Sequence, residues 1–205
     1  MIGIINYGLG NLNSIQNIIM HVGGSSRIVD QSEDLGNFEK LILPGVGAFD
    51  QGISGLQKNN WIDKLEKRVH IDKVPILGIC LGMQLLCRSS EEGKLNGLGW
   101  IDAEVKKFSF TENQNLKVPH MGWNTINVTK ENLLINKDGL EKRFYFVHSY
   151  YVECQDKADA LAKSLYGHDF DASFSKGNIY GVQFHPEKSH KFGMQIIRNF
   201  MNIPC

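Results

Sequence analysis

The 205-residue chain lacks an excess of either charge, because 22 basic side chains balance 22 acidic ones. Proteins that bind nucleic acid or an anionic membrane electrostatically carry a basic surplus, so the sequence predicts neither partner. The chain also lacks a long hydrophobic segment. Its longest uncharged apolar stretch, VPILGICLGMQLLC at 74–87, is too short to span a bilayer. These absences favour a globular protein, and the length suffices for one domain, residues 1–205, with its own core.

Paired cysteines and a secretory leader are missing as well. The four cysteines show no CxxC pair and no framework-like spacing: Cys80, Cys87, Cys154 and Cys205. That pattern is typical of a reducing compartment rather than of a disulfide-stabilised secreted domain. The first 26 residues contain no Lys or Arg and carry several Asn and Gln, unlike a signal peptide. We therefore expect a cytoplasmic protein.

The familiar cofactor motifs are also absent. The glycine loop NYGLGN at 6–11 lacks the third glycine of a dinucleotide fingerprint, since position 13 is Asn. No GxxxxGK[ST] stretch is present for binding nucleotide phosphates. No short-spaced pair of His and Cys suggests a metal site, although Cys80, His185 and Glu187 are metal-binding residue types. The sequence therefore predicts neither a cofactor nor a metal.

The first half of the chain alternates between strand-like and helix-like patterns. Short runs rich in Val, Ile and Leu predict strands at 3–8, 25–30, 39–47 and 73–80. Between and after them, apolar residues at helical spacing predict helices at 12–22, 52–70 and 81–90. Such alternation is typical of a parallel sheet with helices on both faces.

After about residue 97 the chain changes to successive strands with little helix between them. Strands are expected at 100–110, 125–129, 143–153, 160–166 and 178–189, the last with a polar tail, and a closing helix at 191–200. Strands without intervening helices indicate antiparallel pairing. The predicted fold class is therefore a three-layer α/β domain with a mixed, mainly parallel sheet and antiparallel additions in the C-terminal half.

Cys80 lies between Gly78 and Gly82, at the junction of a predicted strand and a predicted helix. Small flanking residues let the backbone turn sharply, as in a nucleophile elbow. The start of a helix also favours the thiolate form of a cysteine. The simpler interpretation is a core cysteine, since free cysteine is commonly buried. The spacing alone leaves both interpretations open.

A nucleophilic thiol needs a base, and one of the seven histidines stands out. His185 ends the strong strand pattern GVQF, and Pro186 prevents the strand from continuing. Glu187 could then fold back to orient the imidazole, as the carboxylate of a catalytic triad does. The alternative is a surface turn with a solvated glutamate, which this segment alone leaves open.

The segment LPGVGAFD at 43–50 is a third candidate. A strand that ends in Pro-Gly-Val-Gly exposes backbone N–H groups, which could form an oxyanion hole with the N–H of Leu81. Every α/β protein also needs ordinary strand-to-helix turns, so this segment by itself is a weak signal.

Three segments in this order, PGVGAF, GICLGMQLL and GVQFHPEKS, resemble the class I glutamine amidotransferases. NYGLGNLNS, KVPHMGWN and FYFVHSYYVE are similar to the glutaminase subunits of imidazole glycerol phosphate synthases. The resemblance covers essentially the whole chain and implies a flavodoxin-like three-layer fold.

By this resemblance, Cys80 is the nucleophile, His185 the general base and acid, and Glu187 the orienting carboxylate. Family positions of the oxyanion region correspond to Gly45, Val46, Gly47 and Leu81. Positions that bind glutamine correspond to Gln84, His148, Ser149 and Tyr150. Positions at the partner interface and the ammonia gate correspond to Asn11 and Lys188.

The implied activity is hydrolysis of L-glutamine to glutamate and ammonia through a cysteine thioester, without a cofactor. Ammonia would pass to a (β/α)8-barrel synthase subunit in a heterodimer, which makes imidazole glycerol phosphate and AICAR in histidine biosynthesis. The main alternative is a paralogous glutaminase that supplies an amidation in surface-sugar (LPS or capsule) biosynthesis. A regulatory module with an inactive triad is not favoured, because all three triad residues are present. A protease of related fold would cleave peptides without a partner.

Overall fold

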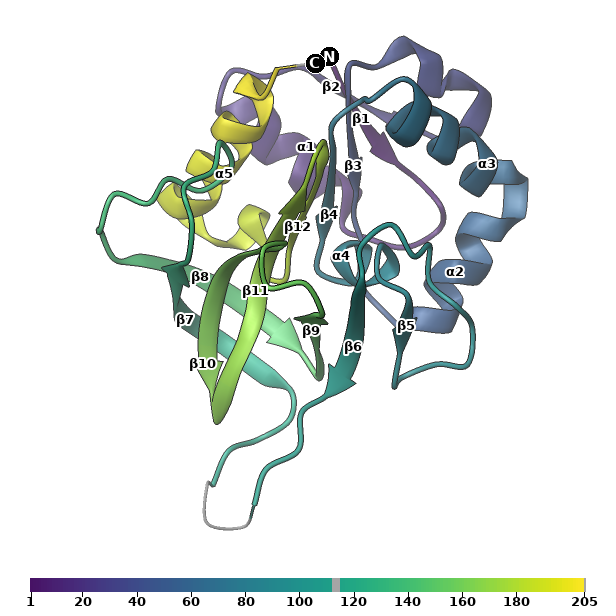
Figure 1. Ribbon diagram of the computed structural model, residues 1–205. Coiled ribbons are helices and arrows are strands. Elements are labelled where there is room, and N and C mark those ends of the chain that lie inside the picture. Colours follow the sequence, from purple (N-terminus) through teal and green to yellow (C-terminus); the bar gives the residue numbers. More distant parts are fainter. Residues whose placement is uncertain (112–114, 205) are drawn as a thin grey trace.

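The computed structural model describes residues 1–111 and 115–204, and its centre is a parallel sheet (Figure 1). Strands β2 (Ser26–Val29), β1 (Ile2–Ile5), β3 (Lys40–Leu43) and β4 (Ile76–Ile79) lie side by side in that order. β12 (Ile179–Val182) adds a further parallel strand beside β4. All residues of β1, β3, β4 and β12 are buried, as expected for strands covered on both faces.

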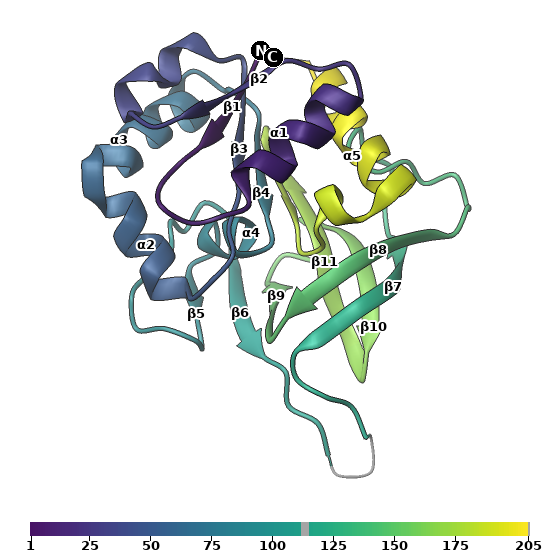
Figure 2. The same ribbon diagram turned by 180° about the vertical axis from the view of Figure 1, so that it is seen from behind.

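Helices cover both faces of this sheet. α1 (Leu12–His21) and α5 (His190–Asn202) lie together on one face, and α2 (Phe49–Gln57) and α3 (Trp61–Glu66) lie on the other (Figures 1 and 2). Neighbouring residues of a strand point to opposite faces, so Ile5 belongs to the core beneath α2 and α3, whereas Ile4 packs on the side of α1 and α5. Because successive strand residues alternate between the two faces, one sheet contributes side chains to two separate cores.

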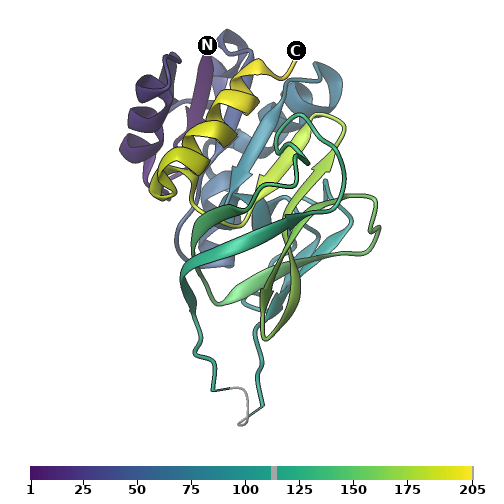
Figure 3. The same cartoon turned by 90° about the vertical axis from the view of Figure 1, so that its left-hand side faces the viewer.

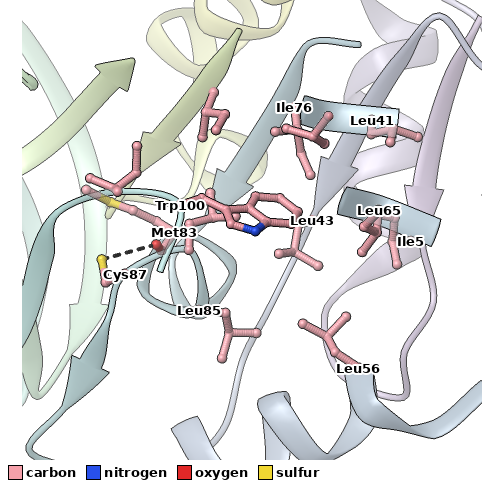
Figure 4. Packing of buried hydrophobic residues seen from close by; sticks show 14 of the residues in the cluster. Ile5, Leu41, Leu43, Leu56, Leu65, Ile76, Met83, Leu85, Cys87 and Trp100 are labelled. Atoms are coloured by element: carbon pink, nitrogen blue, oxygen red, sulfur yellow. Dashed lines mark hydrogen bonds between the residues drawn. The ribbon is translucent and has the colours of Figure 1, made fainter. Parts of the chain in front are cut away.

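The core under α2 and α3 also positions α4 (Leu81–Leu85), the helix that follows β4. Leu43, Met83 and Trp100 lie together at the centre of Figure 4, surrounded by apolar side chains of the sheet and of the covering helices. Met83 is fully buried. Burial of α4 against the sheet therefore holds the residues before and after it in place.

An antiparallel extension continues the sheet beyond β12. The next strands along it are β11 (His168–Lys176), β10 (Ala160–Tyr166), β7 (His120–Val128) and β8 (Lys142–His148). β9 (Tyr150–Cys154) pairs with β11 and with β6 (Ala103–Lys107), which in turn pairs with β5 (Ser89–Ser90). In Figure 3 these teal and green strands lie below the purple and yellow helices.

The predicted α/β fold with a mixed sheet and antiparallel additions is confirmed, but several element boundaries were wrong. The single helix expected at 52–70 is instead α2, a 3-10 turn (Lys58–Asn60), α3 and a π-helical turn (Lys67–Ile71). Asn60 has a φ of 55°, a left-handed conformation that asparagine tolerates better than most residues. The interruption lets Trp61 turn fully into the core.

The strand expected at 143–153 is two strands, β8 and β9, which separate at Ser149. β8 pairs with β7, whereas β9 pairs with β6 and β11, so the chain changes neighbours there. The helix expected at 81–90 ends at Leu85, where the chain turns toward β5. β11 was not predicted, because its polar sequence HDFDASFSK hides a mostly buried strand.

Within the described residues, no helix is long and apolar enough to cross a membrane.

Candidate active site

Cys80 occupies a sharp bend between β4 and α4. Its φ of 54° is unusual for a residue with a side chain, and such strain is typical of functional positions. A Cβ atom on Gly82 would lie 1.9 Å from the carbonyl oxygen of Leu43, and one on Gly78 would lie 2.8 Å from that of Gly82. Both glycines are therefore needed for the bend. The structure confirms the predicted elbow conformation.

His185 and Glu187 form a buried pair just beyond β12. Pro186–Lys188 is a 3-10 turn, which brings Glu187 Oε1 to 2.8 Å from His185 Nδ1. Both side chains are only 2% exposed. Because the carboxylate accepts, Nδ1 carries the hydrogen, and Nε2 is the nitrogen left for the thiol. Nε2 is buried and has no hydrogen-bond partner of good geometry among the described residues.

The surroundings of His185 favour its protonated form. Burial acts against a charged imidazole, but the adjacent Cys80 and Glu187 side chains outweigh it and raise the pKa of His185 above its usual 6.5. A cationic ring is thus stabilised between two groups that can carry negative charge. Such a ring is suited to donate a proton to a leaving group.

Cys80 and His185 line the same cavity, which has a volume of about 310 Å³. This is large enough for an amino acid. Its wall comes from segments far apart in the sequence: Val46, Gly47, Cys80, Leu81, Gln84, Glu92, Pro119, Val147, His148, Ser149, Tyr150 and His185. A larger surface hollow of about 760 Å³ lies near the ends of β1 and β2, and no triad residue lines it.

The residues expected to form an oxyanion hole are only partly on the cavity wall. Val46, Gly47 and Leu81 line it, whereas Gly45 does not. A Cβ on Gly45 would lie 2.7 Å from both Leu81 Cβ and Tyr7 Oη, so this glycine allows the loop to pack against the start of α4. The first N–H groups of a helix have no acceptor within it, which leaves the N–H of Leu81 available.

A hydrogen bond from Tyr7 anchors the segment 44–47. Its hydroxyl donates a hydrogen bond to the carbonyl oxygen of Pro44 at 2.6 Å. Burial and the nearby Cys80 raise the pKa of Tyr7, which therefore stays a neutral donor. The loop beside the cavity is thus tied to the end of β1.

The four residues expected to bind glutamine, Gln84, His148, Ser149 and Tyr150, all line the cavity. Gln84 Nε2 donates to the Tyr150 carbonyl oxygen and to Gln183 Oε1, each at 3.1 Å. Gln183 Nε2 in turn lies 3.7 Å from Cys80 Sγ. An amide network therefore joins the cavity wall to Cys80.

Sequence reasoning missed two polar residues of this region. Gln183 is fully buried and lies just after β12, so its only signal was an amide in an apolar run that leads to His185. Glu92 lines the cavity, and its Oε2 accepts the backbone N–H of Phe49 at 2.9 Å. Nothing in the polar stretch SSEEGK distinguished Glu92 from a solvated carboxylate.

Asn11 and Lys188 lie outside the cavity. Asn11 is exposed directly before α1, and Lys188 is exposed with its Nζ 5.7 Å from the ring centroid of Tyr145. Their expected place at a partner interface stays a prediction.

The remaining described cysteines are poor nucleophiles. Cys87 and Cys154 are fully buried in the core, and burial strongly raises the pKa of both thiols. Among residues 1–111 and 115–204, no group of three or more His, Cys, Asp or Glu side chains could hold a metal ion. The arrangement at Cys80 therefore supports nucleophilic catalysis by a thiol, with His185 moving the proton and Glu187 orienting the ring.

Comparisons with known proteins agree with this chemistry. The family model described as glutamine amidotransferase class-I matches residues 3–203. The chain is 51% identical to "Imidazole glycerol phosphate synthase subunit HisH 2" of Methanococcus maripaludis, over 98% of each chain. It is 47% identical to "Imidazole glycerol phosphate synthase subunit HisH" of Leptospira borgpetersenii, over 99% of this chain and 100% of the other.

Solved structures share the fold at low sequence identity. One is described as the structure of PurLQS from Thermotoga maritima, with a TM-score of 0.76, 17% identity and coverage of 98% of this chain and 97% of that one. Another is described as a glutamine amidotransferase, with a TM-score of 0.73, 17% identity and coverage of 96% of this chain and 98% of that one.

Proposed function

Because the chain belongs to the class I glutamine amidotransferases, we propose that it is the glutaminase subunit of an imidazole glycerol phosphate synthase. It hydrolyses L-glutamine through a thioester on Cys80 and delivers ammonia to a synthase subunit. The observation that carries the proposal is the strained Cys80 elbow, which shares one cavity with His185, the imidazole that Glu187 holds by a buried hydrogen bond.

Before the first step, the proton of the Cys80 thiol has moved to His185 Nε2, whose surroundings favour the cationic ring. In the first step, the Cys80 thiolate attacks the side-chain amide carbon of glutamine. The negative charge that develops on the carbonyl oxygen is stabilised by backbone N–H groups of Leu81, Val46 and Gly47, the expected oxyanion residues that line the cavity. An elbow suits this step because the bend projects the sulfur into the cavity beside these donors.

Collapse of this intermediate needs an acid, because an amide nitrogen is a poor leaving group. Protonated His185 donates to the nitrogen, the C–N bond breaks, and ammonia leaves a thioester on Cys80. A water molecule then gives a proton to His185 and attacks the thioester, which releases glutamate and restores the thiolate. Glu187 holds Nδ1–H throughout, so Nε2 keeps facing the reaction.

The α-ammonium of glutamine needs an acceptor in the cavity, and Glu92 is the carboxylate that lines it among the described residues. Its Oε2 already accepts the Phe49 N–H, which orients the group and leaves Oε1 for the ligand. Ser149 and Tyr150 line the same cavity, where the chain passes from β8 to β9. These groups select an amino acid rather than a simple amide.

The relatives described above are named as subunits, and the proposed partner is a synthase subunit of (β/α)8-barrel type in a heterodimer. Ammonia is protonated and dispersed in water, so the partner must dock beside the cavity and receive it directly. Exposed apolar side chains near this region suit such docking: Val118, Met121 and Trp123. Asn11 and Lys188 remain candidates for the interface and the gate, and the cytoplasm is the expected location.

The test combines the purified chain with its barrel synthase partner and measures synthesis with glutamine or with ammonium salts. Cys80→Ala and Cys80→Ser are expected to abolish glutamine-dependent synthesis and to leave ammonia-dependent synthesis intact. A glutamine-analogue electrophile is expected to label Cys80 alone. Labelling at Cys87 or Cys154 instead contradicts the assignment of the nucleophile.

The same assay decides the acceptor. If a barrel partner that is active with ammonia forms no product from glutamine in the presence of this chain, the histidine-pathway proposal is wrong. The names of the relatives favour this pathway over surface-sugar amidation.

A further inference from the structure

Two buried histidines connect β7 to the wall of the glutamine cavity. His120 Nδ1 lies 2.9 Å from His148 Nε2, and His148 Nδ1 lies 2.8 Å from the carbonyl oxygen of Tyr150. His120 and His148 are only 3% and 6% exposed. The catalytic steps described above use neither ring.

The hydrogen positions in this chain of bonds follow from its ends. The Tyr150 carbonyl can only accept, so His148 Nδ1 must carry the hydrogen, and in a neutral ring Nε2 is then an acceptor. His120 Nδ1 must therefore donate to it. His120 Nε2 is left as an acceptor, and Asn124 Nδ2 lies 3.3 Å away to supply the hydrogen.

The outer end of the hydrogen-bond chain is fixed by backbone groups. Asn124 Oδ1 accepts the N–H of Thr125 at 2.8 Å, and Asn124 Nδ2 also donates to the Leu165 carbonyl at 2.9 Å. The orientation of the amide is thereby determined. A proton added to either ring would place a donor against a donor. In agreement, burial lowers the pKa of His120 to about 4 and that of His148 to about 3.

The inner end of the hydrogen-bond chain reaches the substrate side. The Tyr150 carbonyl that accepts from His148 also accepts from Gln84 Nε2, and the second hydrogen of Nε2 goes to Gln183 Oε1. Both hydrogens of the amide are thus used within the protein. Gln84 Oε1 has no partner among the described residues, and Gln84 lines the cavity.

We propose that the neutral His120–His148 pair is a positioning device, which holds the Tyr150 carbonyl and, through it, the Gln84 amide so that Oε1 accepts a hydrogen bond from glutamine. The proposal rests on the proposed glutaminase function. It also changes the expected role of His148, whose two nitrogens are both engaged inside the protein. His148 and His120 are therefore positioning residues and not ligands of the substrate.

His120 also has a packing role from which its hydrogen bonds must be separated. Its ring stacks on Tyr166 at a centroid distance of 4.1 Å and on Phe146 at 4.9 Å. Two variants separate the roles. His120→Phe keeps a stacking ring but removes the donor to His148, whereas His120→Asn removes the ring but keeps an amide N–H close to the Nδ1 position.

The first experiment measures labelling of Cys80 by a glutamine-analogue electrophile, over a range of concentrations, with the chain in its complex with the synthase subunit. His120→Phe is expected to raise the half-saturating concentration about tenfold, the effect of one lost hydrogen bond, with a smaller change in the maximal rate. His120→Asn is expected to stay within about threefold of the wild type. The reverse order, or equal effects of both variants, overturns the proposal in favour of packing.

Iodoacetamide, which does not use the glutamine site, serves as the control reagent. Its rate with Cys80 should be the same in all three proteins, because the elbow is unchanged. If the wild type is labelled by iodoacetamide but never by the analogue, the proposed function has failed. If the wild type is labelled by the analogue and the variants do not differ, only the positioning role has failed.

A second experiment needs no variant and no activity. In ¹⁵N-histidine-labelled wild-type protein, NMR should show two neutral rings that carry hydrogen on Nδ1 and remain neutral at pH 5. If His120 or His148 carries hydrogen on Nε2, or is protonated at that pH, the hydrogen-bond chain is wrong and the positioning role falls with it.

Discussion

Acidification between pH 7 and pH 5 is expected to destabilise the fold through His120 and His148. The pKa values of these rings fall from 6.5 to about 4 and about 3 on burial. In this range the two histidines take up protons in the unfolded chain, whereas their buried rings stay neutral in the folded chain. The stability contributed by the neutral rings is therefore fully present above pH 6.5 and is lost as the pH falls toward the folded pKa values.

The size of the effect follows from the same shifts. Each ring that stays neutral in the fold makes the free energy of unfolding about 2 kcal/mol smaller at pH 5 than at pH 7. Two rings together contribute about 4 kcal/mol, a large part of the roughly 5–15 kcal/mol that stabilises a typical domain. His185 acts in the opposite direction, because its raised pKa contributes stability that is present below pH 6.5 and lost as the pH rises. His185 therefore offsets only part of the stability that is lost through His120 and His148.

Urea unfolding of the wild type and of His120→Phe at pH 7, 6 and 5 measures this effect. The comparison removes the contribution of His185, which both proteins share. His120→Phe deletes one of the two rings, so the pH-dependent loss should shrink by about 2 kcal/mol. His21→Gln is the matched control, because that ring is exposed at the end of α1 and meets water in the folded and unfolded chain alike.

Two results would contradict this role of the buried rings. One is a wild-type stability that stays constant from pH 7 to pH 5. The other is a pH dependence that is equal in the wild type and His120→Phe. Either result means that the buried rings take up protons as readily in the fold as in the unfolded chain.

Two further substitutions test the loop and the elbow. Gly82→Ala places a Cβ 1.9 Å from the backbone oxygen of Leu43, so it should lower the unfolding free energy by about 2–3 kcal/mol and remove most of the Cys80 labelling. Gly36→Ala is the control, because its Cβ meets open space and should change neither quantity. Equal behaviour of the two variants contradicts the need for a bend. Tyr7→Phe removes the hydroxyl that donates to the Pro44 carbonyl oxygen and should lower the unfolding free energy by about 1 kcal/mol. Because the loop at 44–47 is then released, the rate of glutamine hydrolysis by the isolated chain should change as well. Tyr166→Phe, which removes a hydroxyl that donates to the Lys117 carbonyl oxygen and not to the loop at 44–47, is the control, and identical hydrolysis rates in both variants argue against the tie.

Cys80, His185 and Glu187 could be proposed as a triad from the sequence because their signals are local. Gly78 and Gly82 flank Cys80 within one short segment, and the bend needs only their missing side chains. Pro186 ends the strand pattern directly before Glu187, so the return of the carboxylate to His185 spans two residues. The alternation of strands and helices likewise follows from the period of the apolar residues, which predicts the layers before any contact is known.

The bounds of β8 and β9 and the existence of β11 depended instead on pairing partners far away in the chain. The break at Ser149 arises because β8 pairs with β7 while β9 pairs with β6 and β11, and nothing in FYFVHSYYVE records that change. β11 is a mostly buried strand despite its polar sequence, since the carboxylate of Asp171 accepts the N–H of Cys154 and lies near Lys163. A polar residue can be buried when a distant group satisfies it, and a local pattern does not contain that group.

The bend at Cys80, the end of the strand before His185 and the layered fold therefore follow from local sequence, because glycine, proline and apolar periodicity act over a few neighbouring residues. The construction of the cavity, in contrast, depends on contacts between distant parts of the chain. Gln84 meets Tyr150 and Gln183, and His120 meets His148, across long stretches of chain. Hydrogen bonds between such residues exist only after the sheet has brought their strands and loops together, so the orientation of the cavity wall is a property of the folded chain.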